Sequence, residues 1–220
     1  MNKFWNFGEP DGPNELRLDG EIAKESWWGD EVTPAMFRAE LMQHPGDITV
    51  WINSPGGDVF AASSIYTALK EHKGRVTVKI EAIAASAASI VAMAGDEILM
   101  APTAYMMIHR ASTIALGDTD EMKKAQKALD EVDEGIAALY AGKSGQSLDK
   151  VAAMMKAETW MNADTAVELG FADGKLYQEA APEPKIEPRP EPEPARPTDT
   201  ARERFALRMK LMKHIERGGM

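Results

Sequence analysis

Two serines lie in a run of small residues where an apolar strand is expected to give way to a helix. They are Ser86 and Ser89, in the segment AASAAS at 84–89. A serine hydroxyl in this place can attack a carbonyl carbon, because the amides and the positive end of the following helix would stabilise the resulting oxyanion. A helix cap among closely packed small residues is the structural alternative. The segment alone leaves both interpretations open.

His109 is the histidine best placed to act as a general base. It directly follows the apolar segment 105–108 (YMMI), whereas His44, His72 and His214 lie in polar or terminal contexts. A rigid position at the end of a buried strand suits proton transfer near neutral pH. The histidines match no metal-binding spacing such as H-E-x-x-H, so we expect neither a metal nor a cofactor.

A turn with two adjacent glycines follows the apolar segment 48–52. Gly56 and Gly57 lie in the turn NSPGGD, and without a Cβ they let backbone amides approach a bound group. Taken by itself, such a turn is more often structural. It lacks the G-x-x-x-x-G-K-[ST] pattern of a phosphate-binding loop, so any dependence on ATP would come from a partner.

Composition narrows the class of protein. The 220 residues are 44% hydrophobic and 27% charged, which suits one domain with a core and a short appendage. The formal net charge of −10 argues against a general nucleic-acid-binding protein, and the absence of cysteine excludes a thiol nucleophile and a disulfide. No signal peptide is recognisable, and the stretch 82–95 is too short to span a bilayer, so we expect a cytoplasmic protein.

The elements that must position these groups alternate between strands and helices, which predicts an α/β fold with helices packed on a sheet. Strands are expected at 16–22, 48–52, 76–80, 97–100 and 105–108. Helices are expected at about 34–43, 59–69, 86–94, 118–141 and 162–170, with Thr33 and Ser147 as helix caps.

The composition changes abruptly near the carboxyl terminus. Residues 182–197 hold seven of the thirteen prolines, interleaved with charged residues, and predict an extended spacer. Residues 201–217 carry six basic and two acidic residues with no helix breaker, and predict a basic helix. We therefore divide the chain into an α/β domain at 1–177 that holds the candidate catalytic residues, a Pro/Glu-rich linker at 178–200 and a basic helical tail at 201–220.

Several separate motifs together resemble one family. Four segments and the AAS motif between the first two occur in the order seen in Clp-type serine proteases: 50–63 (VWINSPGGDVFAAS), 106–109 (MMIH), 144–151 (SGQSLDKV) and 158–173 (ETWMNADTAVELGFAD). The resemblance covers about residues 15–175 and implies a Clp protease/crotonase-like β-β-α spiral. The tryptophan pair at 27–28, the ETW motif and the small size resemble the phage and prophage branch, which is associated with head maturation.

The resemblance assigns roles to particular residues. It makes Ser86 the nucleophile, His109 the general base and Glu158 the third member of a triad, where the family usually has Asp. It places the backbone amides of Gly57 and Ala87 in the oxyanion hole.

Alternatives to this assignment remain for the nucleophile and for the acid. Ser89 lies on nearly the same helical face as Ser86. The spacing along the sequence favours Ser86 as the nucleophile, because it lies nine residues before Gly95. Asp164 and Asp173 are the alternative carboxylates. The family commonly has Met-Gly at 87–88, where this chain has two alanines.

The resemblance implies a serine endopeptidase that cleaves scaffold or capsid precursors during phage head maturation. A general peptidase that works with a partner unfoldase, and a catalytically silent assembly or scaffold protein, are the alternatives. Acyl-CoA hydratases and isomerases share the fold, but they do not need the Ser/His/acid set. The family assembles as stacked rings of seven, so we expect a homo-oligomeric ring in which residues 118–141 could form the contact between rings.

Overall fold

The computed structural model describes residues 3–8, 12–23, 34–177 and 203–210. Its contacts divide the chain into two units, Met1–Gln178 and Glu179–Met220. The predicted linker at 178–200 and the predicted cap Thr33 lie outside the described residues. In the second unit, residues 203–210 are helical and exposed, and the rest of the predicted basic helix is outside the described part.

The first unit is built on a mixed sheet, which confirms the α/β prediction. Six strands follow the order β1-β2-β3-β4-β5-β8, while β6 pairs with β4 and β7 pairs with β6. Neighbouring strands from β2 to β5, and the pair β4 and β6, run parallel. The strand bounds are β1 Trp5–Phe7, β2 Glu15–Asp19, β3 Ile48–Ser54, β4 Val76–Ala85, β5 Glu97–Met100, β6 Tyr105–Ile108, β7 Thr159–Asn162 and β8 Gly174–Lys175.

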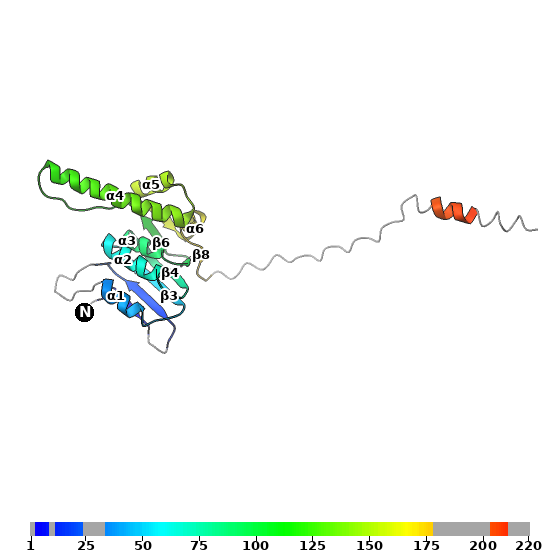
Figure 1. Cartoon of the computed structure of the whole chain (residues 1–220), viewed down its shortest axis with the longest axis horizontal. Helices are drawn as coiled ribbons and strands as arrows, with labels where there is room; N and C mark the ends of the chain where they lie inside the picture. The colour runs from blue at the N-terminus through cyan, green and yellow to red at the C-terminus, as the bar shows by residue number, and fades with distance from the viewer. Residues whose placement is uncertain (1–2, 9–11, 24–33, 178–202, 211–220) are drawn as a thin grey trace, which may run out of the picture. The chain divides into compact units, whose positions relative to one another are not determined.

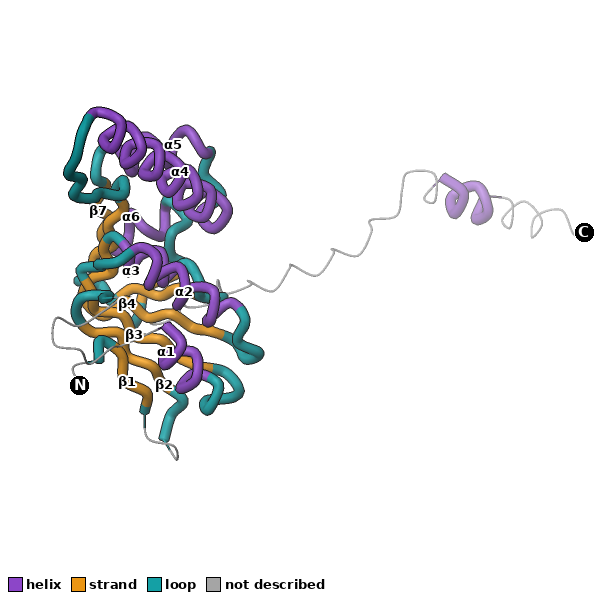
Figure 2. Tube along the Cα trace, turned by 60° about the vertical axis from the view of Figure 1, so that its left-hand side comes forward, coloured by secondary structure: helices purple, strands orange, loops and turns teal. Residues whose placement is uncertain are grey.

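The described residues of this unit also form six helices. Their bounds are α1 Pro34–Leu41, α2 Val59–Lys70, α3 Ala87–Ala92, α4 Thr119–Ser144, α5 Leu148–Lys156 and α6 Ala163–Glu168. Helices α1, α2 and α3 lie together along the sheet, while α4 and α5 form a separate pair above it (Figures 1 and 2). One face of β3 is buried, since alternate side chains from Ile48 to Ser54 are inaccessible to solvent and those between them are partly exposed.

Strand β4 is longer than the sequence pattern predicts, and this difference positions the site. The expected strand ends at Ile80, but β4 continues to Ala85. Its first half pairs with β5 and its second half with β6, from Ile83 opposite Tyr105 onward. Alternation is lost where the pairing changes, since Glu81 and Ala82 are both exposed. The apolar pattern therefore predicted too short a strand. Because β4 continues to Ala85, residue 86 lies at the same edge of the sheet as the carboxyl end of β6.

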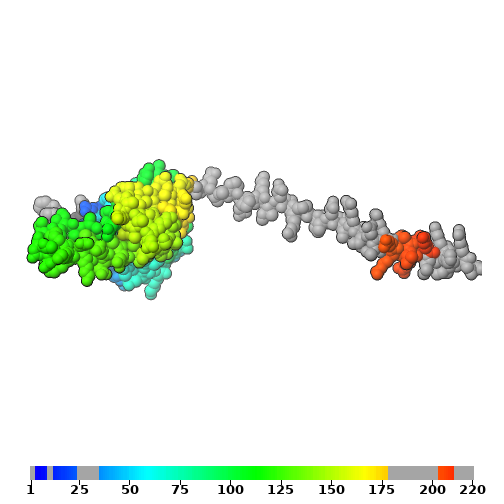
Figure 3. Space-filling model, turned by 90° about the horizontal axis from the view of Figure 1, so that it is seen from above, coloured from blue at the N-terminus to red at the C-terminus, as the bar shows by residue number. Residues whose placement is uncertain are grey.

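Helix α4 extends beyond the rest of the folded unit. It runs for 26 residues, three more at its carboxyl end than predicted, and Asp118 caps its first turn by accepting hydrogen bonds from two backbone amides. Its buried residues are confined to its second half. The first half and the preceding loop project away from the sheet (Figure 1), and the space-filling view shows this part as an exposed arm (Figure 3).

The remaining helix predictions need small corrections. Helix α3 begins at Ala87 and ends at Ala92, inside the expected range. Ser147 caps α5 as predicted, with its hydroxyl accepting a hydrogen bond from the amide of Lys150. Asn162 caps α6 in the same way. The short strands β1, β7 and β8 were not predicted.

Candidate active site

Ser86 stands at the sharp junction between β4 and α3. Its backbone has φ 54° and ψ −125°, a conformation that non-glycine residues rarely adopt. It occupies the N-cap position of α3, yet its side chain makes no capping hydrogen bond. The hydroxyl lies instead 2.7 Å from Nε2 of His109. A strained turn that presents a serine hydroxyl in this manner is the arrangement found at nucleophilic serines.

His109 is delivered to Ser86 by the pairing of two parallel strands. It follows Ile108, the last residue of β6, and the amide of Ser86 donates to the carbonyl of Met107 at 2.9 Å. In the tautomer that carries its proton on Nδ1, the imidazole accepts the Ser86 hydroxyl proton at Nε2. Both side chains are half-buried. The geometry therefore suits transfer of a proton from serine to histidine.

Ser89 has a different environment from Ser86. It is completely buried, and its hydroxyl donates to the carbonyl oxygen of Ser86 at 2.6 Å. It also lies 2.7 Å from the phenol oxygen of Tyr140, whose pKa burial raises well above its usual value. The structure thus pairs His109 with Ser86 and gives Ser89 two other partners.

The double-glycine turn packs directly against the serine. Gly56 and Gly57 have φ of 100° and 142°. A Cβ on Gly56 would lie 2.6 Å from the carbonyl oxygen of Ala85 and 2.8 Å from Cβ of Ser86, so any side chain would overlap the serine turn. Ser54 supports the turn from inside, because its buried hydroxyl accepts from the amide of Gly56 at 3.2 Å.

One cleft joins the turn, the serine and the histidine. It has a volume of about 460 Å³, and Gly57, Ser86, Ala87 and His109 contribute to its wall. In the described part of the chain, neither the amide of Gly57 nor that of Ala87 donates a backbone hydrogen bond. The start of α2 and Ile90 of α3 form another part of the wall. Much of the remainder is apolar and comes from α4 and the loop before it, including Ala111, Ile114, Ala115, Ala125, Ala128, Leu129, Val132 and Ile136.

Glu158 is brought beside His109, but its carboxylate has another partner. Strands β6 and β7 are antiparallel with Ile108 opposite Thr159, which sets Glu158 across from His109. Its φ of 50° is one of three positive values at described non-glycine residues. The exposed carboxylate accepts a hydrogen bond from Nε1 of Trp160 at 3.3 Å, and no hydrogen bond joins it to His109 in the described part of the chain.

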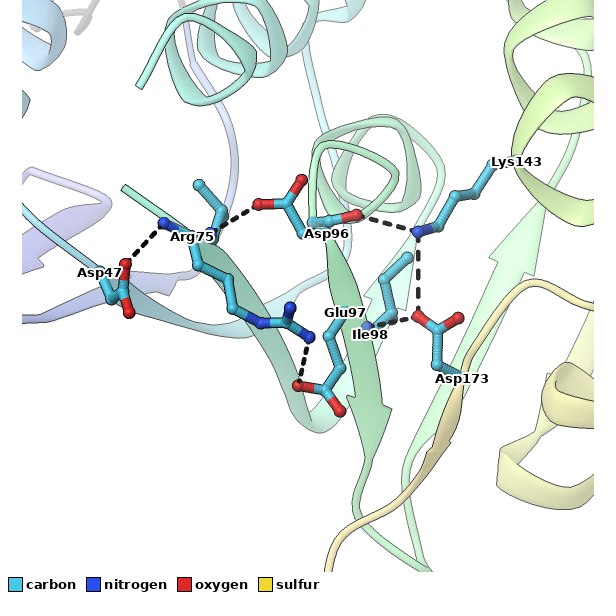
Figure 4. Close-up of polar contacts among 9 residues, drawn as sticks. Asp47, Arg75, Asp96, Glu97, Ile98, Lys143 and Asp173 are labelled. Carbon is cyan, nitrogen blue, oxygen red and sulfur yellow. Dashed lines mark hydrogen bonds and ion pairs between the residues drawn. The ribbon is translucent and has the colours of Figure 1, made fainter. Parts of the chain in front are cut away.

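The alternative carboxylates are engaged elsewhere. Asp164 pairs with Lys175 at 2.5 Å and is exposed. Asp173 accepts the amide of Ile98 at 2.7 Å and faces Lys143 at 3.8 Å, at the amino end of β5 (Figure 4). His109 follows the carboxyl end of β6, at the opposite edge of the sheet from the amino end of β5, because both strands run parallel to β4.

Comparison with known proteins identifies the family of the chain. The family model described as Clp protease matches residues 15–178. The chain belongs to the Clp protease family. Among its curated relatives is an ATP-dependent Clp protease proteolytic subunit of Bacteroides fragilis, 31% identical over 157 residues, 68% of this chain and 76% of the relative. The corresponding subunit of Leuconostoc citreum is 31% identical over 163 residues, 72% and 80% of the two chains.

This Clp protease family member has further polar residues near the site that the sequence did not reveal. Asp133 of α4 is buried and accepts Nε of Arg110 at 2.6 Å and the amide of Ala111 at 2.7 Å. Its hydrogen bond and charge raise the pKa of the Arg110 guanidinium. Nothing in a helix rich in acidic residues distinguishes Asp133, because its role depends on which face of α4 is buried.

Two negative findings apply to the described residues. They contain no group of three or more His, Cys, Asp or Glu side chains arranged to hold a metal ion. No helix among them is sufficiently long and apolar to cross a membrane.

Proposed function

We propose that this Clp protease family member is a serine endopeptidase in which Ser86 is the nucleophile and His109 the general base. The observation that carries the proposal is the 2.7 Å contact between the Ser86 hydroxyl and Nε2 of His109, at a strained turn that opens into an apolar cleft. Its family relatives are named as proteolytic subunits.

The reaction begins when His109 takes the Ser86 hydroxyl proton and the oxygen attacks a peptide carbonyl. The amides of Gly57 and Ala87 then donate to the oxyanion of the tetrahedral intermediate. Its collapse breaks the peptide bond, and the imidazolium returns its proton to the leaving amine. Water, activated by the same histidine, hydrolyses the acyl-enzyme and restores the serine.

Glu158 completes the triad in this proposal. Its position across from His109 allows the carboxylate to turn from Trp160 toward Nδ1 and stabilise the imidazolium. Glu158→Gln should then lower kcat by about four orders of magnitude. Trp160→Phe removes only the competing hydrogen bond and should keep or raise kcat. A Glu158→Gln variant with the wild-type rate would remove this residue from the triad.

A covalent serine probe tests the proposal directly. Wild type, Ser86→Ala and Ser89→Ala are treated exhaustively with a fluorophosphonate, and the intact masses are measured. One adduct is expected on wild type and on Ser89→Ala, with fluoride as the leaving group, and none on Ser86→Ala. An adduct that persists in Ser86→Ala, or a folded wild type that never reacts, would contradict the assignment.

We further propose that the enzyme acts on scaffold or capsid precursors during phage head maturation, as a homo-oligomeric ring in the host cytoplasm. The resemblance of the ETW motif at 158–160 to the phage branch supports this substrate class. The exposed first half of α4 offers a surface for contact between rings. Co-expression with the neighbouring capsid proteins should yield shortened products only with active Ser86, and sedimentation of active enzyme should show an oligomer.

Unprocessed capsid proteins beside an active peptidase would instead favour a general peptidase served by a partner unfoldase. A folded, assembled chain without any reactive serine would favour the silent assembly protein. The two outcomes are distinguished by the probe experiment above.

A further inference from the structure

Helix α4 has a short buried stripe, and two of its three members carry polar groups. The buried residues of the helix are Asp133, Ala137 and Tyr140. Positions separated by four and three residues lie on one helical face. A buried carboxylate or phenol costs free energy unless it is hydrogen-bonded, so the partners of these groups indicate what this face does.

Asp133 holds the chain that immediately follows His109. Its carboxylate accepts the backbone amide of Ala111 at 2.7 Å and the guanidinium of Arg110 at 2.6 Å. The bond to Ala111 involves the main chain, so it fixes the path of the backbone two residues beyond the imidazole. The side chain of Asp133 is 11% exposed, which limits the competition from water.

Tyr140 holds the chain at Ser86 through a second hydroxyl. The Ser89 hydroxyl donates its one proton to the carbonyl oxygen of Ser86 at 2.6 Å. It must therefore act as acceptor toward Tyr140, whose O–H donates across 2.7 Å. This buried series runs from α4 to the main chain of the residue with φ 54°. A strained backbone persists only where its surroundings hold it.

We infer that α4 sets the position of Ser86 relative to His109, with Asp133 and Tyr140 as positioning residues. This inference rests on the proposed function, since it concerns the geometry of proton transfer between the two side chains. Asp133 and Tyr140 lie two turns apart on one face of the same helix. The first holds the main chain just after His109, and the second holds the main chain at Ser86 through Ser89. A displacement of about 1 Å at a reacting pair can lower the rate about a hundredfold.

The competing explanation is that these hydrogen bonds only attach α4 to the sheet. Lys143 of the same helix separates the two explanations. Its ammonium group donates to the carbonyl oxygen of Gly95 at 2.9 Å and faces Asp173 at 3.8 Å (Figure 4). These contacts attach α4 at the amino end of β5 and involve neither Ser86 nor His109.

The test compares labelling rate with stability in the full-length protein. The second-order rate constant for fluorophosphonate labelling and the thermal unfolding midpoint are measured for wild type, Asp133→Ala, Tyr140→Phe and Lys143→Met. We expect the rate to fall about tenfold or more in the Asp133 and Tyr140 variants, at temperatures where each is fully folded. Lys143→Met should lower the midpoint but label at the wild-type rate.

Two further variants sharpen the comparison. Asp130→Asn removes the other carboxylate on Arg110, at 3.2 Å, while leaving the bond from Ala111 to Asp133, and should label normally. Should Asp133→Ala fail to fold, Ser89→Ala and Tyr140→Phe decide the matter. The double variant should be no slower than the slower single variant, because both changes interrupt the same series of hydroxyls.

The outcomes separate this inference from the proposed function. Absence of labelling at Ser86 in wild type would overturn the proposed function, and the positioning roles with it. Normal labelling of wild type, with rates in the Asp133 and Tyr140 variants no lower than in Lys143→Met, would overturn the inference alone. Helix α4 would then be attached to the sheet without setting the reacting pair.

Discussion

The two ends of the same sheet carry different polar groups and serve different purposes. At the amino ends of β4 and β5, the carboxylates of Asp47, Asp96 and Asp173 accept the backbone amides of Arg75, Val76 and Ile98 at 2.7–2.9 Å (Figure 4). At the carboxyl ends of β3, β4 and β6 lie the double-glycine turn, Ser86 and His109.

The two ends differ in their backbone conformation and in whether their backbone amides have hydrogen-bond acceptors. At the amino ends of β4 and β5 the amides are paired and the strands have no positive φ, while the carboxylates there are about half exposed, as at Asp96 and Asp173. The carboxyl ends combine positive φ at Gly56, Gly57 and Ser86 with two residues lining a cleft, Gly57 and Ala87, whose amides have no backbone acceptor among the described residues. Parallel sheets commonly bind ligands at their carboxyl ends. Here the amino ends contribute hydrogen bonds that stabilise the fold, whereas the carboxyl ends hold a strained backbone and the amides of the proposed oxyanion hole.

The largest effect should come from the serine itself. Ser86→Ala removes the nucleophile and should lower peptide turnover by about four orders of magnitude or more. The unfolding midpoint should change little, because the hydroxyl makes no capping bond. Turnover and thermal unfolding measured on the same preparation check this. Residual turnover within tenfold of wild type would contradict the proposal that the catalytic groups lie at the carboxyl ends of the strands.

Gly56→Ala should have the next largest effect. The added Cβ would lie 2.6 Å from the carbonyl oxygen of Ala85, at a φ of 100°, so the serine turn must move. We expect a loss in kcat/KM of about a hundredfold and destabilisation of about 1–3 kcal/mol. Gly142→Ala, in α4 with open space around it, is the matched control and should be neutral or slightly stabilising.

At the amino ends, Asp173→Ala should affect stability without affecting chemistry. Loss of the acceptor for the Ile98 amide should cost about 1–2 kcal/mol in chemical denaturation, while kcat/KM stays unchanged in the folded protein. Asp164→Asn, which alters only an exposed ion pair, should change neither quantity. A large loss of activity in Asp173→Ala would restore this residue as a candidate for the catalytic acid.

A similarly small effect should come from the ion pair between Arg75 and Glu97. The two side chains are 57% and 38% exposed, and their atoms are 3.2 Å apart. Glu97→Gln should shift the free energy of unfolding by less than about 0.5 kcal/mol, with no change in labelling rate. A larger shift, removable by salt, would show that the surface network in Figure 4 stabilises the sheet cooperatively.

Much of the fold was predictable because its signals are local. Strands β3, β5 and β6 carry continuous apolar segments, and the cap Ser147 can be recognised from a few neighbouring residues. The short strands β1, β7 and β8 were missed because none of them has more than two consecutive apolar residues, whereas β5 and β6, at four residues each, have three and four. The three missed segments are strands only because a partner is present to pair with them.

The sequence by itself determined the candidate chemistry: Ser86 in a run of small residues, His109 after an apolar strand, and two adjacent glycines in the turn after another strand. Only the tertiary structure decided the partners. It paired His109 with Ser86, turned Glu158 toward Trp160 and buried one face of α4. Residue type fixes what a side chain can donate or accept, but which groups meet depends on strand pairing and helix rotation across distant segments.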